Sequence, residues 1–139
     1  QAGVPCDLTD AVASLRSLGE RAAGYDVFCS IHHNSASAPA QGAEVLVCKS
    51  KSDPDDLQLS AMMSAEIAAE LGIRDRIAGG RDPRLHLGIL KGAESTDVRV
   101  SVLAELYFIH VPIPDVVDWS NRGGEAVARA ILKWLAANP

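Results

Sequence analysis

Two long, almost wholly apolar runs restrict the fold of this chain more than any other feature of its sequence. They are "YDVFCSI" at residues 25–31 and "VRVSVLAELYFI" at residues 98–109, and "AEVLVCK" at residues 43–49 is a shorter run of the same kind. Apolar runs of this length are typical of strands that a folded domain covers on both faces. We therefore place the first run in the centre of a sheet and predict strands near residues 26–32, 43–48 and 98–108.

Apolar residues at helical spacing separate these strands. Residues 54–71 form the clearest helix, because Asp53 is a natural N-cap and Gly72 can end the helix. Strands that alternate with helices favour an α/β fold. The sequence predicts one α/β domain, a mostly parallel twisted sheet flanked by helices, with a loop-rich stretch at residues 73–97 and helices near residues 10–23, 54–71 and 122–136.

The composition excludes several classes of function. The 139 residues are enough for one domain with its own core. The net charge is −5 and Lys and Arg form no cluster, so nucleic acid is not the expected partner. No apolar run approaches the roughly 20 residues of a membrane-spanning helix, and no signal peptide is visible. The three cysteines form no C-x-x-C pair and no even-numbered disulfide set. Cys29 and Cys48 lie in apolar runs, so we expect their thiols to be buried.

Two histidines and one carboxylate lie where the predicted strands end. His32 and His33 follow the first run, and Glu105 lies toward the end of the last. Adjacent side chains on a strand point to opposite faces, so we expect only one of the two imidazoles to act as a ligand. The same alternation predicts that Glu105 and Tyr107 share one face of their strand and that Phe108 lies on the other.

A histidine near a carboxylate at the edge of a sheet suits metal-assisted hydrolysis. Histidine can hold zinc, and a carboxylate can take the proton from the zinc-bound water. A carboxylate in so apolar a strand is costly to bury ionised unless a metal or a catalytic role compensates for it. From the residues alone, a purely structural role for His32 stays open.

The segments "YDVFCSIHHNS", "GAEVLV", "LGILK" and "VSVLAELYFI" follow one another along the chain, and an amphipathic helix closes it. This order resembles the zinc-dependent N-acetylmuramoyl-L-alanine amidases, the family of bacterial autolysins and phage endolysins. The family signature "SIHxN" matches residues 30–34, and the family's "VLVELGFI" segment matches residues 102–109 loosely. Because the resemblance covers nearly the whole chain, it implies that residues 1–139 belong to an amidase catalytic domain.

The resemblance implies a peptidoglycan hydrolase that uses Zn²⁺ to cleave the amide bond between N-acetylmuramic acid and L-alanine. It implies that His32 is a zinc ligand and that Glu105 is the catalytic carboxylate. Asn34 matches the asparagine of the signature and is expected to orient the loop or to contact the substrate. His33 falls at the variable position of the signature.

Two motifs of the family do not occur in this chain. The family's first zinc histidine lies in a "GHGG"-like motif, and a ligand glutamate follows it. We therefore expect the N-terminal strand-helix-strand portion of the domain to be missing and residues 1–139 alone to bind zinc weakly. One alternative is a metal-poor, inactive amidase-like module that binds or regulates at the cell wall. Another is a different hydrolase that assembles a zinc site from His32, His86 or His110.

The resemblance also implies a partner and a place of action. The partner is peptidoglycan, without nucleic acid and without a membrane span, and the protein is expected to be a monomer. It is expected in the cell envelope, either in the periplasm or outside the cell. A phage-encoded protein released to the cell wall is the other expectation.

Overall fold

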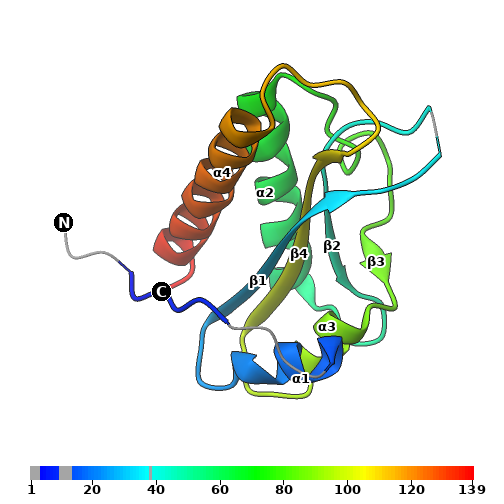
Figure 1. Ribbon diagram of the computed structural model, residues 1–139. Helices are drawn as coiled ribbons and strands as arrows, with labels where there is room; N and C mark the ends of the chain where they lie inside the picture. Colours follow the sequence, from blue (N-terminus) through cyan, green and yellow to red (C-terminus); the bar gives the residue numbers. More distant parts are fainter. Residues whose placement is uncertain (1–3, 10–13, 38) are drawn as a thin grey trace.

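A four-stranded sheet with the strand order β1-β4-β2-β3 organises the chain (Figure 1). The computed structural model describes residues 4–9, 14–37 and 39–139. The strands are β1 (Val27–Asn34), β2 (Glu44–Cys48), β3 (Arg84–Leu85) and β4 (Val100–Phe108). The helices are α1 (Leu15–Gly19), which continues as a short 3-10 turn η1 (Glu20–Ala22), α2 (Pro54–Leu71), α3 (Gly88–Ala93) and α4 (Val116–Ala137).

The predicted fold class, one α/β domain with a sheet flanked by helices, is confirmed, and the sheet is mixed. β1 runs parallel to β4 and β2 runs parallel to β3, whereas β2 and β4 are antiparallel. The three predicted strands all form, with ends within two residues of the predicted ones. β1 lies at the edge of the sheet that the described residues form, and Ile31 in it is 49% exposed. The prediction of a central strand there is therefore wrong for this sheet.

The helix over residues 54–71 forms as predicted, and its start has a capping box. The Asp53 carboxylate accepts hydrogen bonds from the backbone N–H groups of Asp55 and Asp56, and the Asp56 side chain accepts one from the backbone N–H of Asp53. These bonds satisfy donors that a helix start otherwise leaves unpaired. Gly72 ends the helix with φ of 65°, a left-handed conformation that glycine adopts without strain.

The last helix begins earlier than predicted, at Val116 instead of near residue 122. The Asp115 carboxylate caps it by accepting from the backbone N–H groups of Val117 and Asp118. Two adjacent glycines inside α4 weaken its helical pattern in the sequence. One of them lies in close contact with β4, since a Cβ on Gly123 would lie 2.9 Å from a methyl group of Leu106.

Only part of the predicted first helix is observed. Residues 10–13 lie outside the described residues, and residues 15–22 form α1 and η1. The stretch at residues 73–97 was expected to be loop-rich, but it contains β3 and α3. α3 is short and owes its place to a close contact with α1, because a Cβ on Gly92 would lie 2.1 Å from the carbonyl oxygen of Arg16.

The two faces of the sheet are covered differently (Figure 1). α2 and α4 lie side by side over one face and close the larger apolar cluster, which includes Leu59, Ile67, Val102 and Trp134. α1 and α3 cover the lower part of the other face, where the second cluster includes Leu46 and Leu103. His32, Glu44 and Glu105 belong to neither cluster, although they lie in the strands that carry both. We name the part of this second face nearest the carboxyl end of β4 the open face.

No helix in the described ranges is both long enough and apolar enough to cross a membrane.

Candidate active site

Three polar residues from neighbouring strands form one row across the open face. Glu105 of β4 pairs with His32 of the parallel strand β1 and with Glu44 of the antiparallel strand β2. Residues paired directly across strands point their side chains to the same face of the sheet. The fold thus sets an imidazole and two carboxylates next to one another on three different strands.

Glu105 carries a buried oxygen without a hydrogen-bond partner. Within the described part of the chain, its Oε2 is the one buried side-chain nitrogen or oxygen atom without a hydrogen-bond partner. Burial, and to a lesser degree the negative charge of Glu44, raises the pKa of Glu105 to about 7. A carboxyl group with a pKa near neutrality can both take and give a proton in a reaction.

Glu44 is almost fully buried, with 3% of its surface exposed, and both of its carboxylate oxygens have partners. Its Oε1 accepts a hydrogen bond from Asn34 Nδ2 at 2.6 Å. Its Oε2 accepts from Arg76 Nε at 2.8 Å and from Arg81 Nε at 3.3 Å. This network ties the ends of β1 and β2 to the loop that follows α2.

Asn34 is engaged within the chain at both ends of its amide. Its Nδ2 donates to Glu44, and its Oδ1 accepts from the backbone N–H of Ser35 at 2.8 Å. The observed contacts therefore make Asn34 a residue that positions Glu44 and the start of the loop. Its contact with a substrate stays a prediction.

The two adjacent histidines point to opposite faces of the sheet, as predicted. The exposed His32 shares the row of Glu105, and its Nε2 lies 2.9 Å from Ser30 Oγ. The His33 ring instead packs on Tyr107, with ring centroids 4.4 Å apart, and its Nε2 lies 3.2 Å from Ser120 Oγ of α4. His33 thus joins β1 to the helical side of the sheet, whereas His32 stays on the open face.

Comparison with known protein families identifies the family of this chain. The family model described as N-acetylmuramoyl-L-alanine amidase matches residues 7–136, which is nearly the whole chain. The chain belongs to the N-acetylmuramoyl-L-alanine amidase family. Membership in this family supports peptidoglycan amidase activity, with the cell wall as the place of action.

Solved amidase structures share the fold at low sequence identity. An N-acetylmuramoyl-L-alanine amidase from Clostridium difficile 630 superposes with a TM-score of 0.73 at 20% identity, covering 94% of this chain and 69% of the other. The catalytic domain of CwlV from Bacillus (Paenibacillus) polymyxa var. colistinus gives 0.67 at 21% identity, covering 91% and 68%. The catalytic domain of CD27L, an endolysin targeting Clostridia difficile, gives 0.56 at 19% identity, covering 88% and 62%. A search of curated proteins found no match.

The described residues of this amidase do not make a complete zinc site. They contain no group of three or more His, Cys, Asp or Glu side chains arranged to hold a metal ion, and a catalytic zinc normally needs three protein ligands. His86 is exposed between β3 and α3, and the exposed His110 packs edge-on against Phe108. The hypothesis of a site assembled from His32, His86 and His110 is therefore not supported by this geometry.

A β-bulge changes which residues of β4 reach the open face. Between His32 and Asn34, β1 advances two residues while β4 advances three, from Glu105 to Phe108. Tyr107 consequently packs in the apolar cluster under α2 and α4, and Phe108 lies beneath the Arg76 guanidinium, 5.0 Å from its ring centroid. The predicted alternation of Tyr107 and Phe108 is wrong, because a bulge inserts one unpaired residue and reverses the faces beyond it.

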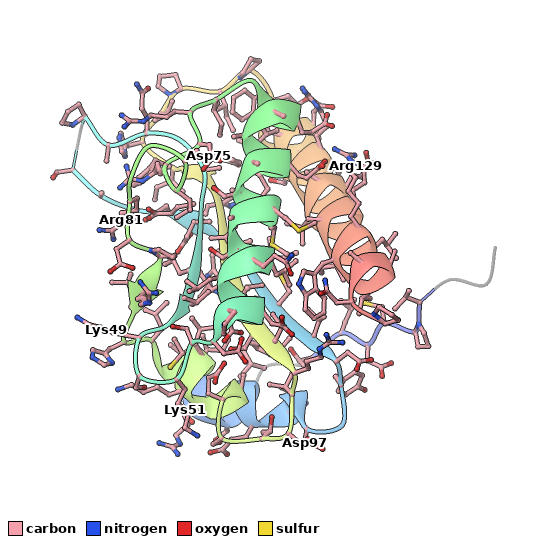
Figure 2. All side chains as sticks on the ribbon, turned by 180° about the vertical axis from the view of Figure 1, so that it is seen from behind. Lys49, Lys51, Asp75, Arg81, Asp97 and Arg129 are labelled. Carbon is pink, nitrogen blue, oxygen red and sulfur yellow. The ribbon has the colours of Figure 1, made fainter. Side chains whose placement is uncertain are left out.

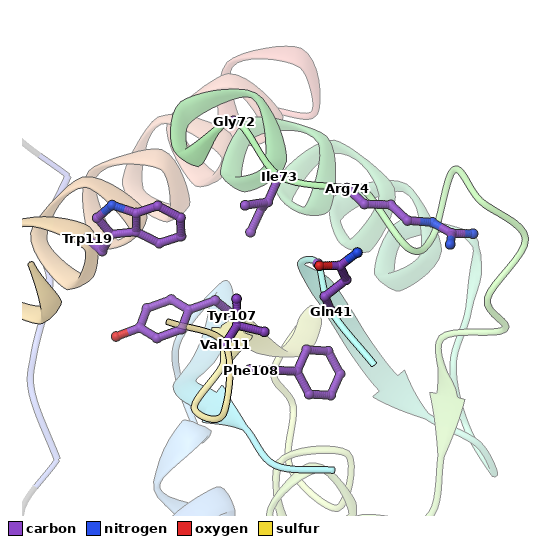
Figure 3. A pocket seen from close by; sticks show the side chains of 9 residues that line it. Gln41, Gly72, Ile73, Arg74, Tyr107, Phe108, Val111 and Trp119 are labelled. Atoms are coloured by element: carbon purple, nitrogen blue, oxygen red, sulfur yellow. The ribbon is translucent and has the colours of Figure 1, made fainter. Parts of the chain in front are cut away.

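A cavity of about 250 Å³ opens beyond the carboxyl end of β4 (Figure 3). Tyr107, Ile73 and Trp119 line it, and Arg74 extends away from it in the view. Neither His32 nor Glu105 contributes to the lining. The predicted site residues His32 and Glu105 therefore lie outside the cavity.

Sequence reasoning singled out His32 and Glu105 but missed Glu44 and its two arginines. Glu44 carries the same signal as Glu105, because it is also a carboxylate in an apolar strand, in "GAEVLV". Arg76 and Arg81 left no comparable signal. They lie 32 and 37 residues from Glu44 in a loop with alternating charges, and only the fold brings them to it.

Proposed function

We propose that this chain acts as the catalytic domain of a peptidoglycan amidase that cleaves the amide bond between N-acetylmuramic acid and L-alanine, with Glu105 as the catalytic carboxylate. The observation that carries the proposal is the unpartnered buried oxygen of Glu105, directly paired with His32. A buried polar atom without a partner costs about 1–3 kcal/mol. A fold retains such a cost most readily where a substrate or a reacting water supplies the missing partner.

Glu105 first acts as a general base in this proposal. Its carboxylate takes a proton from the water that attacks the scissile carbonyl, and then gives it to the nitrogen of the departing L-alanine. One group can do both because its pKa is raised to about 7 by burial. Glu44 pairs with two arginines, and its negative charge contributes to the raised pKa of Glu105.

His32 is one zinc ligand in this proposal. A bound zinc ion would polarise the substrate carbonyl and acidify a water molecule. The described residues supply one imidazole and not a set of three ligands, so no step is assigned to the metal here. His32 itself lies beside Glu105 on the open face, and its Nε2 lies within hydrogen-bonding distance of Ser30 Oγ.

The site of action follows from the substrate. We propose that the protein works as a monomer on peptidoglycan in the cell envelope, or at the cell wall after release of a phage. The net charge of −5 gives the chain no general attraction for nucleic acid.

The test is hydrolysis of a defined muropeptide by the natural polypeptide that carries residues 1–139, supplied with zinc. Release of a free L-alanine amino group, identified by mass spectrometry, is the expected result. Glu105→Gln should lower the rate by about 10²–10⁴-fold, the usual contribution of a general base. Glu125→Gln makes the same chemical change on the exposed side of α4 and should leave the rate unchanged.

His32→Ala should also abolish hydrolysis, whereas His86→Ala, a matched change at an exposed histidine, should not. Cleavage that survives Glu105→Gln would contradict the assignment of the catalytic residue. Binding to peptidoglycan with no cleavage at any zinc concentration would contradict the enzymatic function. It would support the alternative, a metal-poor module that binds or regulates at the cell wall.

A further inference from the structure

Residues 74–84, which we name the arginine loop, bring an unusual amount of positive charge beside the open face. The loop contains four arginines and two aspartates, and even with the buried Glu44 included one positive charge remains in excess. The chain as a whole carries a net charge of −5, so this loop runs against the overall charge. Figure 2 shows Arg81 at the outer side of the loop and Asp75 nearer to α2.

The loop is built so that two arginines converge on a single carboxylate oxygen. The backbone N–H of Arg81 donates to the carbonyl of Arg76 at 2.9 Å, which brings the two residues together. Asp75 holds the turn between them, because its Oδ1 accepts from the backbone N–H groups of Ile77 and Ala78 and from Ser64 Oγ. Both guanidinium groups then reach Glu44 Oε2 through Nε.

One arginine is enough to neutralise the charge of Glu44, so the second arginine can pair with a further anion. Arg76 makes the shorter contact, is 24% exposed, and is fixed over the Phe108 ring. Arg81 makes the longer contact and has 41% of its side chain exposed. In the described part of the chain, its hydrogen bond to Glu44 uses only Nε. The two terminal nitrogens of Arg81 remain for a planar anion, which a guanidinium binds with two parallel hydrogen bonds.

The position of Arg81 relative to Glu105 indicates which part of a substrate would carry such an anion. Glu44 is the direct neighbour of Glu105 on the next strand, and strands lie about 5 Å apart. Arg81 lies in the loop that leads into β3, and β3 adjoins β2 on the side opposite to β4 and β1. An extended peptide covers about 3.5 Å per residue. A substrate cleaved at Glu105 that runs across the strands toward β2 therefore reaches Arg81 roughly two residues beyond the scissile amide.

We infer that Arg81, held beside Arg76 by Glu44, selects substrates that carry a free carboxylate on the residue after the released alanine, and discriminates against the amidated form. The inference rests on the proposed amidase function. It adds a specificity determinant outside the catalytic pair of His32 and Glu105. Arg81 binds the substrate in this role and takes no part in bond cleavage.

The test compares two probes, N-acetylmuramoyl-L-alanyl-D-glutamate and the same compound with both carboxylates converted to amides. NMR titration of the full chain measures the dissociation constant of each. The acid should bind about tenfold more tightly than the diamide, which corresponds to one charge-assisted hydrogen-bonded pair. Raising the salt concentration from about 0.05 to 0.5 M should reduce this preference, because the pair is partly exposed.

Arg81→Gln should remove the preference without changing the affinity for the diamide. The control is Arg84→Gln, since Arg84 is a similarly exposed arginine of the same loop that pairs with Asp82 instead of Glu44. The preference should survive in that variant. Equal binding of acid and diamide by the unmodified chain, or a preference that persists in Arg81→Gln, would overturn the inference.

Hydrolysis of the two probes separates this inference from the proposed function. Equal cleavage of acid and diamide by the natural polypeptide would remove the role of Arg81 and leave the amidase assignment intact. Preferential binding of the acid with no cleavage of either probe would remove the amidase assignment and leave the carboxylate site.

Discussion

The two ends of β4 each bury a carboxylate, and the fold treats the two in opposite ways. At the first end, Asp56 is 2% exposed and both of its oxygens are satisfied. Its Oδ1 accepts from the backbone N–H of Ser101 at 2.8 Å, and its Oδ2 accepts from the backbone N–H of Asp53 at 3.0 Å. At the other end, Glu105 has a buried oxygen without any partner in the described part of the chain.

This difference separates a structural carboxylate from one available for chemistry. Burial raises the pKa of both groups, to about 6 for Asp56 and about 7 for Glu105. At Asp56 the two backbone donors oppose that rise, and at Glu105 the charge of Glu44 adds to it. Glu44 resembles Asp56 in having all its partners, although it lies directly beside Glu105. The position on the open face therefore does not by itself leave a carboxylate oxygen without a partner: Glu44 and Glu105 share that face, and among the described residues the unpartnered oxygen belongs to Glu105.

The largest expected effect tests whether Glu44 is structural. Glu44→Ala removes the buried charge that holds Arg76 and Arg81 together and leaves the amide of Asn34 without its acceptor. We expect the free energy of unfolding to fall by about 3 kcal/mol, somewhat less than for a fully buried pair because Arg81 is partly exposed. Urea unfolding followed by circular dichroism measures it.

Arg81→Ala serves as the control for Glu44→Ala and should cost less than about 1 kcal/mol, as an exposed partner does. A small effect of both substitutions would remove Glu44 from the group of structural carboxylates and reopen a direct role in the reaction.

The next effect concerns Asp56 at the closed end. Asp56→Ala leaves the buried N–H of Ser101 without an acceptor and breaks the capping box of α2, so we expect a loss of about 2 kcal/mol. Asp55→Ala, at the neighbouring, partly exposed position of the same helical turn, should cost much less. If Glu105→Gln destabilises the protein as much as Asp56→Ala does, the contrast between the two ends of β4 is wrong.

The sequence was informative where the signal is local. The apolar runs located all three of the predicted strands, and the capping residues located both ends of α2. Adjacent histidines on a strand had to point apart, and they do. The pairing of His32 with Glu105 follows from two parallel strands whose carboxyl ends meet.

Features that depend on distant contacts were not accessible in the same way. The bulge in β4 adds one residue to an otherwise regular alternation, and nothing in "AELYF" marks it. The sequence predicts a loop where α3 forms, because α3 contains two glycines and its stability comes from packing on α1. The arginines around Glu44 converge from a loop that owes its shape to Asp75 and to backbone contacts with Ala43.

A smaller effect, dependent on pH, tests the unpartnered state of Glu105. The pKa of Glu105 in the folded protein, about 7, lies above its usual 4.5. Between these two values the unfolded chain releases a proton that the folded chain retains, so this group lowers stability as pH rises and has no further effect above about pH 7. Glu105→Gln removes that loss. In metal-free protein, the variant should match the original at pH 4 and exceed it by about 2 kcal/mol at pH 8.

Urea unfolding at the two pH values measures the difference, and Glu125→Gln on the exposed side of α4 should show no such dependence on pH. A stability difference between Glu105→Gln and the original that is the same at pH 4 and pH 8 would mean that Glu105 has a partner in solution. In that case Glu105 would be a structural carboxylate, like Asp56.

The smallest expected effect is that of zinc on residues 1–139 alone. A ligand that binds only the folded state stabilises it in proportion to the logarithm of its concentration over its dissociation constant. The described residues offer the imidazole of His32 beside the carboxylate of Glu105, since Glu44 already has partners on both oxygens. Such a pair replaces too few of the water molecules around the ion to bind it tightly. We therefore expect zinc to leave the unfolding midpoint nearly unchanged, and isothermal titration to show weak binding.

Tight one-to-one binding abolished by both His32→Ala and His86→Ala would mean that His86 reaches the open face in solution. Tight binding abolished by His32→Ala but not by His86→Ala would instead indicate His110 or Glu105 as the second zinc ligand. In the latter case the unpartnered oxygen of Glu105 would bind the metal and would not act as a base.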